Sequence, residues 1–363
     1  MSELLTKKTR KTIINRLIKD KIALSGLIIL VLLYLSILFA GFLSPYPKDY
    51  SNRHLSYAPP SKIFTIDRNG KLSRPYTYNY IRKFNPETFK IEYKPDRSKK
   101  YYLKFFSDGF SYKFLGIIPT RLHFVTVDKP GELFLTGTDI NGRDNFSRLL
   151  YGGQISLTIG FLALFISYPI GALYGGISGY FGGRTDNIMM RVAETIMCIP
   201  GFYLLISLAA ILPANISSTQ RFTLITVILS FIGWAGLSRV IRGMVLSIKS
   251  QEFVEAARSI GAGKLRIILK HILPQTASYV IVAMTLNVPG YILAESGLSF
   301  LGLGIQQPDA SWGNMLKEAK EYFNIINRPW LLTPGFLIFI AVLAFNLVGD
   351  AIRDILYPRS KVR

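Results

Sequence analysis

EAARSIGAGKLRIILKHILP, residues Glu255–Pro274, is a polar and basic stretch that lies between two apolar segments of this chain. Ser250 is placed to cap a helix here, and Glu252 and Glu255 fall in its first turns, where the helix dipole favours anions. Apolar side chains recur at the spacing of one helix face, and they are Phe253, Ala256, Ala257 and Ile260. The pattern predicts a short amphipathic helix.

A glycine corner and a second amphipathic pattern follow. Gly261 and Gly263 interrupt the first helix, and Pro274 marks the next boundary. Between Gly263 and Pro274, apolar residues again recur at helical spacing, and they are Leu265, Ile268, Leu269 and Ile272. The basic residues among the outward positions are Lys264, Arg266 and Lys270. We expect two short helices joined by the corner and held against a membrane. An interfacial loop that only tethers two spans explains this pattern equally well.

The composition indicates a polytopic membrane protein. Of the 363 residues 50% are hydrophobic, and the mean hydropathy is +0.30, which is too apolar for an ordinary soluble protein. The net charge is +21, but lysine and arginine are expected in excess on the cytoplasmic flanks of spans, so we predict no nucleic-acid partner. A single cysteine, Cys198, and three scattered histidines (His54, His123 and His271) predict no disulfide framework, no metal site and no cofactor.

The chain begins with a basic segment followed by a long apolar one. Residues 1–21 include Lys7, Lys8, Arg10, Lys11, Arg16, Lys19 and Lys21. Ile22–Leu43 carries no charge. A run of this length exceeds a signal-peptide core of about 7–15 residues and suffices for a span of about 20. We expect a retained anchor with the N-terminus inside the cell.

Residues 44–134 are predicted to form an extracytoplasmic, β-rich insert. Apolar and polar side chains alternate in Phe64–Ile66 and Lys90–Tyr93, and Asn69-Gly70 is a hairpin signal. The segment holds many lysines, but long loops cross the membrane largely regardless of their charge.

The remaining apolar segments predict five further spans. They are charge-free stretches at Ile155–Gly183, Thr195–Gln220, Phe222–Ser238, Ile272–Ala294 and Pro329–Gly349. Together with the first, they predict an all-α polytopic protein of six transmembrane helices with both termini cytoplasmic. The loops and tail that this topology places inside are rich in basic residues, as the positive-inside rule requires, and these are Arg184, Arg191, Arg239, Arg242, Lys249, Arg353, Arg359, Lys361 and Arg363. Small residues within the spans suit close helix packing, among them Gly171, Gly175, Gly176 and Gly179.

The polar stretch also carries a family resemblance. Glu255-Ala256-Ala257, then three residues and Gly261, and later Leu273-Pro274, resemble the EAA loop of ABC importer permeases. The chain departs from the usual pattern at His271, where an aliphatic residue is typical. The resemblance implies that residues 250–274 form a coupling helix that inserts into a cleft of a cytoplasmic ATPase. The coupling residues that it implies are Glu255, Ala256, Ala257, Arg258, Gly261 and Lys264.

A second motif precedes the second span. It consists of Gly137-Thr138-Asp139, Gly142-Arg143-Asp144, Ser147-Arg148-Leu149, Gly152-Gly153 and Ser156-Leu157. These residues are similar to a segment of permeases in the peptide/opine/nickel branch of ABC importers. Asp144 is placed to cap a short amphipathic helix on the outer interface. A calcium loop is excluded, because Arg143 stands where an oxygen ligand is needed and no glutamate closes the loop.

A third motif lies after the coupling stretch. Residues 295–304 read ESGLSFLGLG and residues 311–315 read SWGNM, and both are similar to the same branch and to the second, C-type permease of a heterodimer. Glu295 is an ionisable residue at the end of a span, which makes it a candidate for the translocation path. A solvated or capping role near the outer interface explains Glu295 equally well.

The sequence shows no catalytic motif. RSIGAGKL at residues 258–265 differs from a phosphate loop, because Arg258 and Leu265 replace the required glycine and hydroxyl. Paired carboxylates and nucleophile motifs are also missing from the sequence. We therefore expect a non-catalytic subunit whose ATP is hydrolysed by partner chains.

The resemblance as a whole implies the type I ABC importer permease fold in a bacterial inner (plasma) membrane. Residues 1–43 would form the N-terminus and first span, 44–134 the insert, and 135–363 the core of five helices. The implied partners are a homologous second permease, two cytoplasmic ABC ATPases, an extracytoplasmic solute-binding protein and the lipid bilayer. Oligopeptides or dipeptides are the expected substrates, with nickel chelates, opines or glutathione as alternatives.

Two other classes of protein were weighed. An ion-driven secondary carrier would need intramembrane carboxylates, and the spans hold almost none apart from Glu295. A membrane-anchored receptor built around residues 44–134 would leave five spans without a purpose. The insert itself is expected either to widen the platform for the binding protein or to be a decoration without a role in transport.

Overall fold

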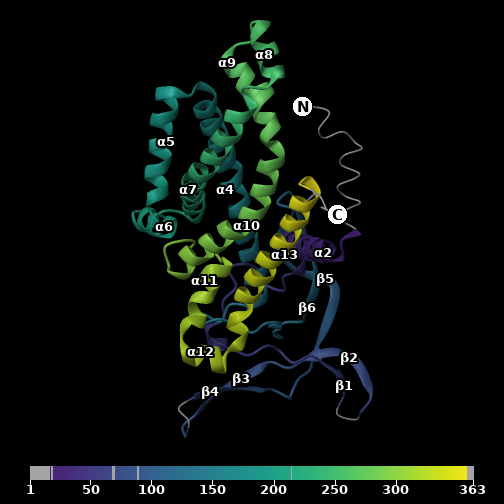
Figure 1. Cartoon of the computed structure of the whole chain (residues 1–363). Helices are drawn as coiled ribbons and strands as arrows, with labels where there is room; N and C mark the ends of the chain where they lie inside the picture. Colours follow the sequence, from purple (N-terminus) through teal and green to yellow (C-terminus); the bar gives the residue numbers. More distant parts are fainter. Residues whose placement is uncertain (1–16, 18, 68–69, 88–89, 214, 358–363) are drawn as a thin grey trace, which may run out of the picture. The chain divides into compact units, whose positions relative to one another are not determined.

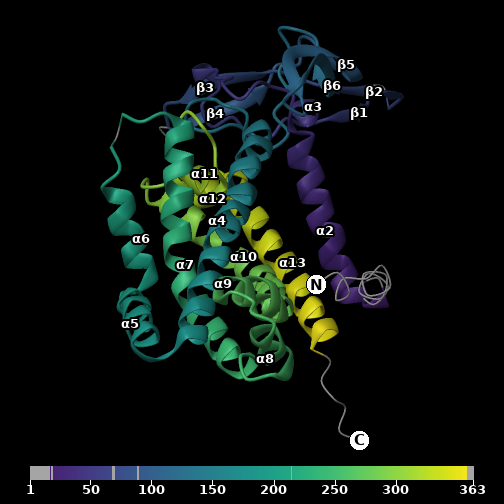
Figure 2. The ribbon, with the colours of Figure 1, turned by 90° about the horizontal axis from the view of Figure 1, so that it is seen from above.

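The computed structural model describes residues 17, 19–67, 70–87, 90–213 and 215–357, drawn in Figures 1 and 2. Asn69, most of the basic N-terminal residues (Lys7, Lys8, Arg10, Lys11 and Arg16) and the basic C-terminal residues Arg359, Lys361 and Arg363 lie outside the described part. The chain separates into two compact units, each assembled from distant segments. We call them the helical unit (Met1–Val31, Leu157–Leu298 and Phe339–Arg363) and the mixed unit (Leu32–Ser156 and Ser299–Ile338).

Long apolar helices dominate the described chain. The α-helices of the described residues are α2 Lys21–Leu38, α3 Ala40–Leu43, α4 Asn145–Phe181, α5 Gly183–Cys198, α6 Gly201–Ala210, α7 Ser218–Ile248, α8 Glu252–Ser259, α9 Lys264–Ile267, α10 Ala277–Phe300, α11 Trp312–Leu316, α12 Tyr322–Asn327 and α13 Thr333–Leu356. Five helical segments among the described residues are long and apolar enough to cross a membrane, and these are Lys21–Leu38, Asn145–Phe181, Ser218–Ile248, Lys264–Phe300 and Pro329–Leu356.

The predicted span Thr195–Gln220 is not one straight helix. Its apolar residues belong to α5 and α6, which are bent by 81° and pass as a span only together. Pro200 lies at the bend, and the residue before a proline is driven out of the helical region. Ile199 is accordingly extended, with φ −84° and ψ 124°. The segment Phe222–Ser238, by contrast, lies within the 31-residue helix α7.

Glycines bring α4 and α7 into close contact in the helical unit. A Cβ at Gly171 would lie 2.7 Å from the carbonyl oxygen of Trp234. One turn apart along α4, Gly175 and Gly179 face the carbonyls of Ser238 and Arg242 in the same way. Any side chain on this stripe would push the two backbones apart, as expected for small residues between membrane helices.

The insert is rich in strands. Its strands are β1 Phe64–Ile66, β2 Leu72–Thr77, β3 Tyr80–Asn85, β4 Lys90–Pro95, β5 Tyr101–Phe114 and β6 Ile118–Val127. The order β1-β2-β5-β6 forms one antiparallel sheet, and β3 pairs with β4. The alternating segments at 64–66 and 90–93 are strands as the sequence predicted. Two small cores lie beneath, around Phe134 and around Leu133.

Candidate functional site

The corner of the polar stretch is a helix-capping motif. Gly261 has φ +80° and follows the end of α8. The backbone N–H of Gly261 donates to Arg258 O at 2.9 Å, and that of Ala262 donates to Ala257 O at 3.1 Å. These are the paired bonds of a Schellman cap, which needs a left-handed residue at the position of Gly261. α9 begins three residues later, so the chain reverses within a rigid turn.

The buried face of α8 differs from the predicted one. Val254 and Ala257 are buried, whereas Phe253, Ala256 and Ile260 are exposed, Ile260 by 84%. The periodicity identified an apolar stripe correctly, but most of that stripe faces away from the protein. Ser250 does not cap the helix either, because its hydroxyl donates to Ser247 O and the N-cap residue of α8 is Gln251. The stripe of Phe253, Ala256 and Ile260 is therefore free to contact another molecule.

The second half of the stretch departs from regular α-helical winding. α9 passes at Ile268 into a π-helical turn, Ile268–Ile272, and then into a 3₁₀ turn, Leu273–Thr276. Ile267, Ile268 and Ile272 are buried, whereas Leu265 and Leu269, two of the four residues predicted for the apolar face, are exposed. Pro274 does not interrupt the helical winding, because it lies in the first turn of the 3₁₀ segment Leu273–Thr276, which leads directly into α10.

Two aromatic side chains at the end of α4 hold the corner. The guanidinium of Arg258 lies 5.3 Å from the ring centre of Tyr180, and Lys264 Nζ lies 5.5 Å from that of Phe181. Each contact is a cation–π interaction, worth roughly 0.5–1 kcal/mol at an exposed site. Figure 1 shows α8 and α9 together at one end of α10. Glu255 is exposed on α8.

An ion pair with a buried carboxylate joins α5 to α7 in the helical unit. Asp186 of α5 accepts from Arg242 Nε at 3.0 Å and from Arg242 Nη2 at 2.5 Å, and Ser178 of α4 donates to the same carboxylate. Three helices are thus joined by one carboxylate. Sequence reasoning counted Arg242 only as a charge that orients a loop, and it missed Asp186. The available signal was an isolated acid just after an apolar span that ends near basic residues.

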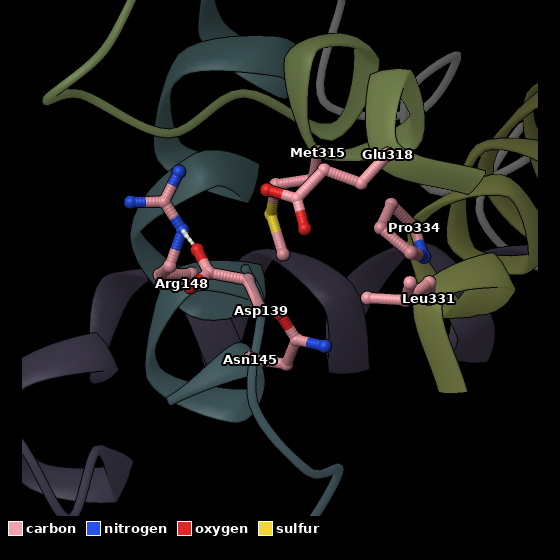
Figure 3. A pocket seen from close by; sticks show the side chains of 7 residues that line it. All are labelled: Asp139, Asn145, Arg148, Met315, Glu318, Leu331 and Pro334. Carbon is pink, nitrogen blue, oxygen red and sulfur yellow. Dashed lines mark ion pairs between the residues drawn. The ribbon is translucent and has the colours of Figure 1, made fainter. Parts of the chain in front are cut away.

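A second group of charges lies within the mixed unit. Asp139 Oδ2 accepts from Arg143 Nε at 2.6 Å and lies 3.6 Å from Arg148 Nε. Its Oδ1 accepts from the backbone N–H groups of Asn141 and Arg143. Figure 3 shows Asp139, Arg148 and Glu318 around one small cavity. Glu318 accepts from the N–H of Ile140 at 3.0 Å. Asp139, the acidic residue of the excluded calcium loop, is thus bound to two arginines.

Asp144 caps α4 as predicted, since the N–H and the hydroxyl of Ser147 both donate to its Oδ2. No separate interfacial helix forms, because α4 runs without interruption over Asn145–Phe181. Asp144 is fully buried and its Oδ1 has no hydrogen-bond partner among the described residues. Burial raises the pKa of Asp144 to about 7. Burial and the charge of Asp139 likewise raise the pKa of Glu318 to about 7.

Two motifs that the sequence showed separately meet in the mixed unit. Trp312 donates its indole N–H to the carbonyl of Leu149 at 2.9 Å and its backbone N–H to Ser156 Oγ. A Cβ at Gly153 would lie 3.0 Å from the Trp312 ring. Ser311 and Asn314 cap α11 reciprocally. The SWGNM segment therefore packs directly on residues 149–156 of α4, and no sequence pattern predicted this contact.

Glu295 is fully buried in α10, with 0% of its surface exposed. Ser296 Oγ lies 3.4 Å from its carboxylate. The solvated role that the sequence left open is therefore wrong, whereas a role in the translocation path stays a prediction. Among the described residues, no group of three His, Cys, Asp or Glu side chains is placed to hold a metal ion.

Apolar helices of membrane-spanning length, with a polar, glycine-capped corner between α8 and α9, define a multi-pass membrane protein. The chain belongs to the family described as binding-protein-dependent transport system inner membrane component, whose model matches residues 167–362. A second model, the N-terminal TM domain of oligopeptide transport permease C, matches residues 10–60. The protein is thus an ABC importer permease of the C type, a multi-pass inner membrane protein.

Similar proteins carry the names of peptide permeases. The oligopeptide transport system permease protein OppC of Haemophilus influenzae is 44% identical over 226 residues, covering 62% of this chain and 70% of the relative. The dipeptide transport system permease protein DppC of Bacillus subtilis is also 44% identical, covering 62% and 68%. The glutathione transport system permease protein GsiD of Escherichia coli is 41% identical, covering 62% and 72%.

Proposed function

We propose that this chain forms half of the translocation path of an ATP-driven importer for oligopeptides or dipeptides. The observation that carries the proposal is the corner at Gly261, a rigid reversal that presents exposed apolar and charged side chains beside a braced helix end. The names of the relatives support a peptide substrate. Glutathione, itself a short peptide, is the competing substrate because one relative is named for it.

The proposed topology has six transmembrane helices, with α5 and α6 together forming one bent span. Both termini and the coupling loop 250–274 then lie in the cytoplasm. Residues 44–134 form an extracytoplasmic insert between the first span, 1–43, and the permease core, 135–363. The uneven distribution of lysine and arginine supports this orientation.

Coupling is proposed to work through the exposed side of α8. Ala256 and the neighbouring apolar stripe enter a cleft of one cytoplasmic ATPase, since small side chains permit close approach. Glu255 contributes a charged contact that sets orientation more than affinity. Arg258 and Lys264 act differently: their contacts with Tyr180 and Phe181 transmit movement of the corner to α4. Ala257 is buried and anchors α8 to the rest of the loop.

The importer is completed by partners. A second homologous permease supplies the other half of the path, two ABC ATPases hydrolyse ATP, and an extracytoplasmic binding protein delivers the substrate. ATP binding closes the two ATPases, the attached coupling loops move together, and the path opens toward the binding protein. Glu295, buried in a span, is proposed to face this path when the two permeases associate.

The test is ATP hydrolysis by the reconstituted complex. Glu255→Lys and Gly261→Val are expected to lower substrate-stimulated hydrolysis several-fold while membrane insertion is unchanged. Glu87→Lys, an exposed glutamate in the insert, is the matched control for the charge reversal. Normal transport by both coupling variants would refute the coupling assignment. Stimulation by a dipeptide series, compared with glutathione and a nickel chelate, identifies the substrate class.

A further inference from the structure

An apolar groove lies where the end of α2 and α3 meet the tip of the β5–β6 hairpin, all within the mixed unit. Figure 2 shows α3 beside β5 and β6. The groove encloses about 650 Å³, a size typical of sites for small molecules, which span about 300–1,000 Å³. Its walls include Leu32, Leu35 and Phe39 of α2 and its extension, and Phe114, Ile118 and Leu122 of the hairpin.

The tip of this hairpin is apolar and exposed. Residues 114–118 read FLGII, and the exposed fractions are 50% for Leu115, 80% for Ile117 and 57% for Ile118. Two backbone donors of the turn are satisfied within it, because Gly116 N donates to Lys113 O and Ile117 N to Phe114 O, both at 3.1 Å. Internal pairing of this kind lowers the cost of placing an apolar turn in a medium that offers no hydrogen bonds.

The position of the groove along α2 indicates which medium surrounds the hairpin tip. Leu32, which lines the groove, lies six residues before Leu38 at the end of α2. At 1.5 Å per residue this is roughly 9 Å inside the helix. α2 is one of the segments long and apolar enough to span a membrane. The groove that the hairpin shares with α2 therefore extends beside the apolar part of a span and does not stop at its end.

Aromatic contacts hold the hairpin in this place. Phe39 lies 5.5 Å from Phe114 between ring centres, and Phe42 lies 6.1 Å from both Phe106 and Phe124. Gly41 allows the ring of Tyr112 to lie against the backbone of α3. Lys113, exposed next to the tip, has a long side chain that can extend to lipid headgroups while its stem stays among apolar groups.

We propose that the β5–β6 tip is inserted into the membrane leaflet at which α2 ends, and that the groove between them holds an acyl chain of a membrane phospholipid. The groove continues the lipid-facing surface of a spanning helix, so the adjacent bilayer supplies its occupant. The insert then has a membrane anchor of its own, independent of any role in coupling or substrate binding.

Insertion of the tip is tested with the full chain in phospholipid vesicles. In a Cys198→Ser background, Ile117→Cys and Leu72→Cys each receive an environment-sensitive fluorophore; Leu72, 90% exposed in β2, is the matched control. We expect acyl-brominated phospholipid to quench the Ile117 probe several-fold more than the Leu72 probe, and aqueous iodide to do the reverse. Equal access of iodide to both probes would overturn the proposal.

The occupant is tested by filling the groove from either wall. Leu35→Trp and Thr120→Trp narrow it, and Ile66→Trp adds the same side chain at an exposed site in β1. Native mass spectrometry in detergent with one defined phospholipid should show at least one fewer retained lipid for the two groove variants than for the control. An unchanged lipid count in a folded groove variant contradicts lipid occupancy. Lipid occupancy is also contradicted if adding the second permease protects the Ile117 probe from both quenchers, because the partner chain would then cover this surface.

Discussion

The indole N–H of Trp312 donates to the carbonyl oxygen of Leu149 across 163 positions of sequence. This bond ties the SWGNM segment to the N-terminal part of α4, just after the loop in which Asp139 pairs with Arg143 and with Arg148 of α4. The motif residues of the mixed unit are thus mutually supporting, which explains why so many of their polar groups are buried.

Replacing the indole tests this connection. Trp312→Phe keeps an aromatic ring but removes the donor from a fully packed site, so we expect a loss of about 1 kcal/mol in the free energy of unfolding. Thermal unfolding in detergent measures it. Tyr322→Phe, at a position that is 78% exposed, is the control and should leave the midpoint unchanged. An equal midpoint for both variants would show that the bond contributes nothing.

The two glycines of the coupling corner should differ sharply. Gly261 has φ +80° with no atom within 4 Å of an added Cβ, so Gly261→Ala brings backbone strain without a clash. A left-handed conformation costs an L-residue roughly 1–2 kcal/mol. Gly263 has φ −61° and equal space, so Gly263→Ala should be tolerated. We expect transport-coupled ATP hydrolysis to fall only for Gly261→Ala, and equal activity of the two would refute the strained-corner argument.

Breaking the ion pair between Asp186 and Arg242 in the helical unit should destabilise the protein strongly. Asp186→Asn leaves Arg242 without its carboxylate, and loss of one partner of a buried pair costs on the order of 3–5 kcal/mol. The partial exposure of Arg242 places the expected loss at the lower end. Glu194→Gln, which disrupts the exposed pair with Arg191, should cost about 1 kcal/mol or less. Denaturant-induced unfolding compares the two, and similar losses would contradict a structural role for Asp186.

The raised pKa values of Asp144 and Glu318 predict a pH dependence of stability. Both values are about 7, above those of ordinary carboxyls, so the folded state binds these protons more tightly than the unfolded chain. The contribution is therefore complete below the ordinary carboxyl pKa and is lost as the pH rises through about 7. We expect a lower thermal midpoint at about pH 8 than at about pH 5, where stability is favoured by protonation.

Glu318→Gln removes one of the two titrating groups. The slope of the midpoint against pH should decrease, because one pKa unit corresponds to about 1.4 kcal/mol of folding free energy. Glu87→Gln, at an exposed position, serves as the control and should retain the wild-type slope. A Glu318→Gln slope equal to that of wild type would show that this carboxyl does not titrate between the two pH values.

Periodicity located elements better than it assigned faces. The helix at Glu252–Ser259, its glycine corner and the strands at Phe64 and Lys90 lie where the patterns predicted. The exposed face of α8 was missed because an apolar stripe by itself does not show which side packs against the protein. Leu265 and Leu269, predicted on an apolar face held against a membrane, are exposed, whereas Ile268 and Ile272 of the same face are buried.

Long-range pairing was beyond the sequence patterns. Three contacts join residues whose local patterns are unrelated. They are the hydrogen bond from Trp312 to Leu149, the ion pair of Arg242 with Asp186 and the cation–π contact of Arg258 with Tyr180. Glu295 illustrates the same limit: its place at the end of an apolar run left a buried and a solvated role equally open, and the tertiary structure buries it.

The sequence by itself determined the apolar segments, the rigid corner between two short helices and membership in the permease family. These properties depend on hydrophobic periodicity and on local backbone preferences, such as the left-handed glycine at 261. Only the tertiary structure decided which faces are exposed, which charges are paired and that the β5–β6 hairpin shares an apolar groove with α2. Those features depend on contacts between distant segments, and the free energy of such contacts comes from packing that no local pattern encodes.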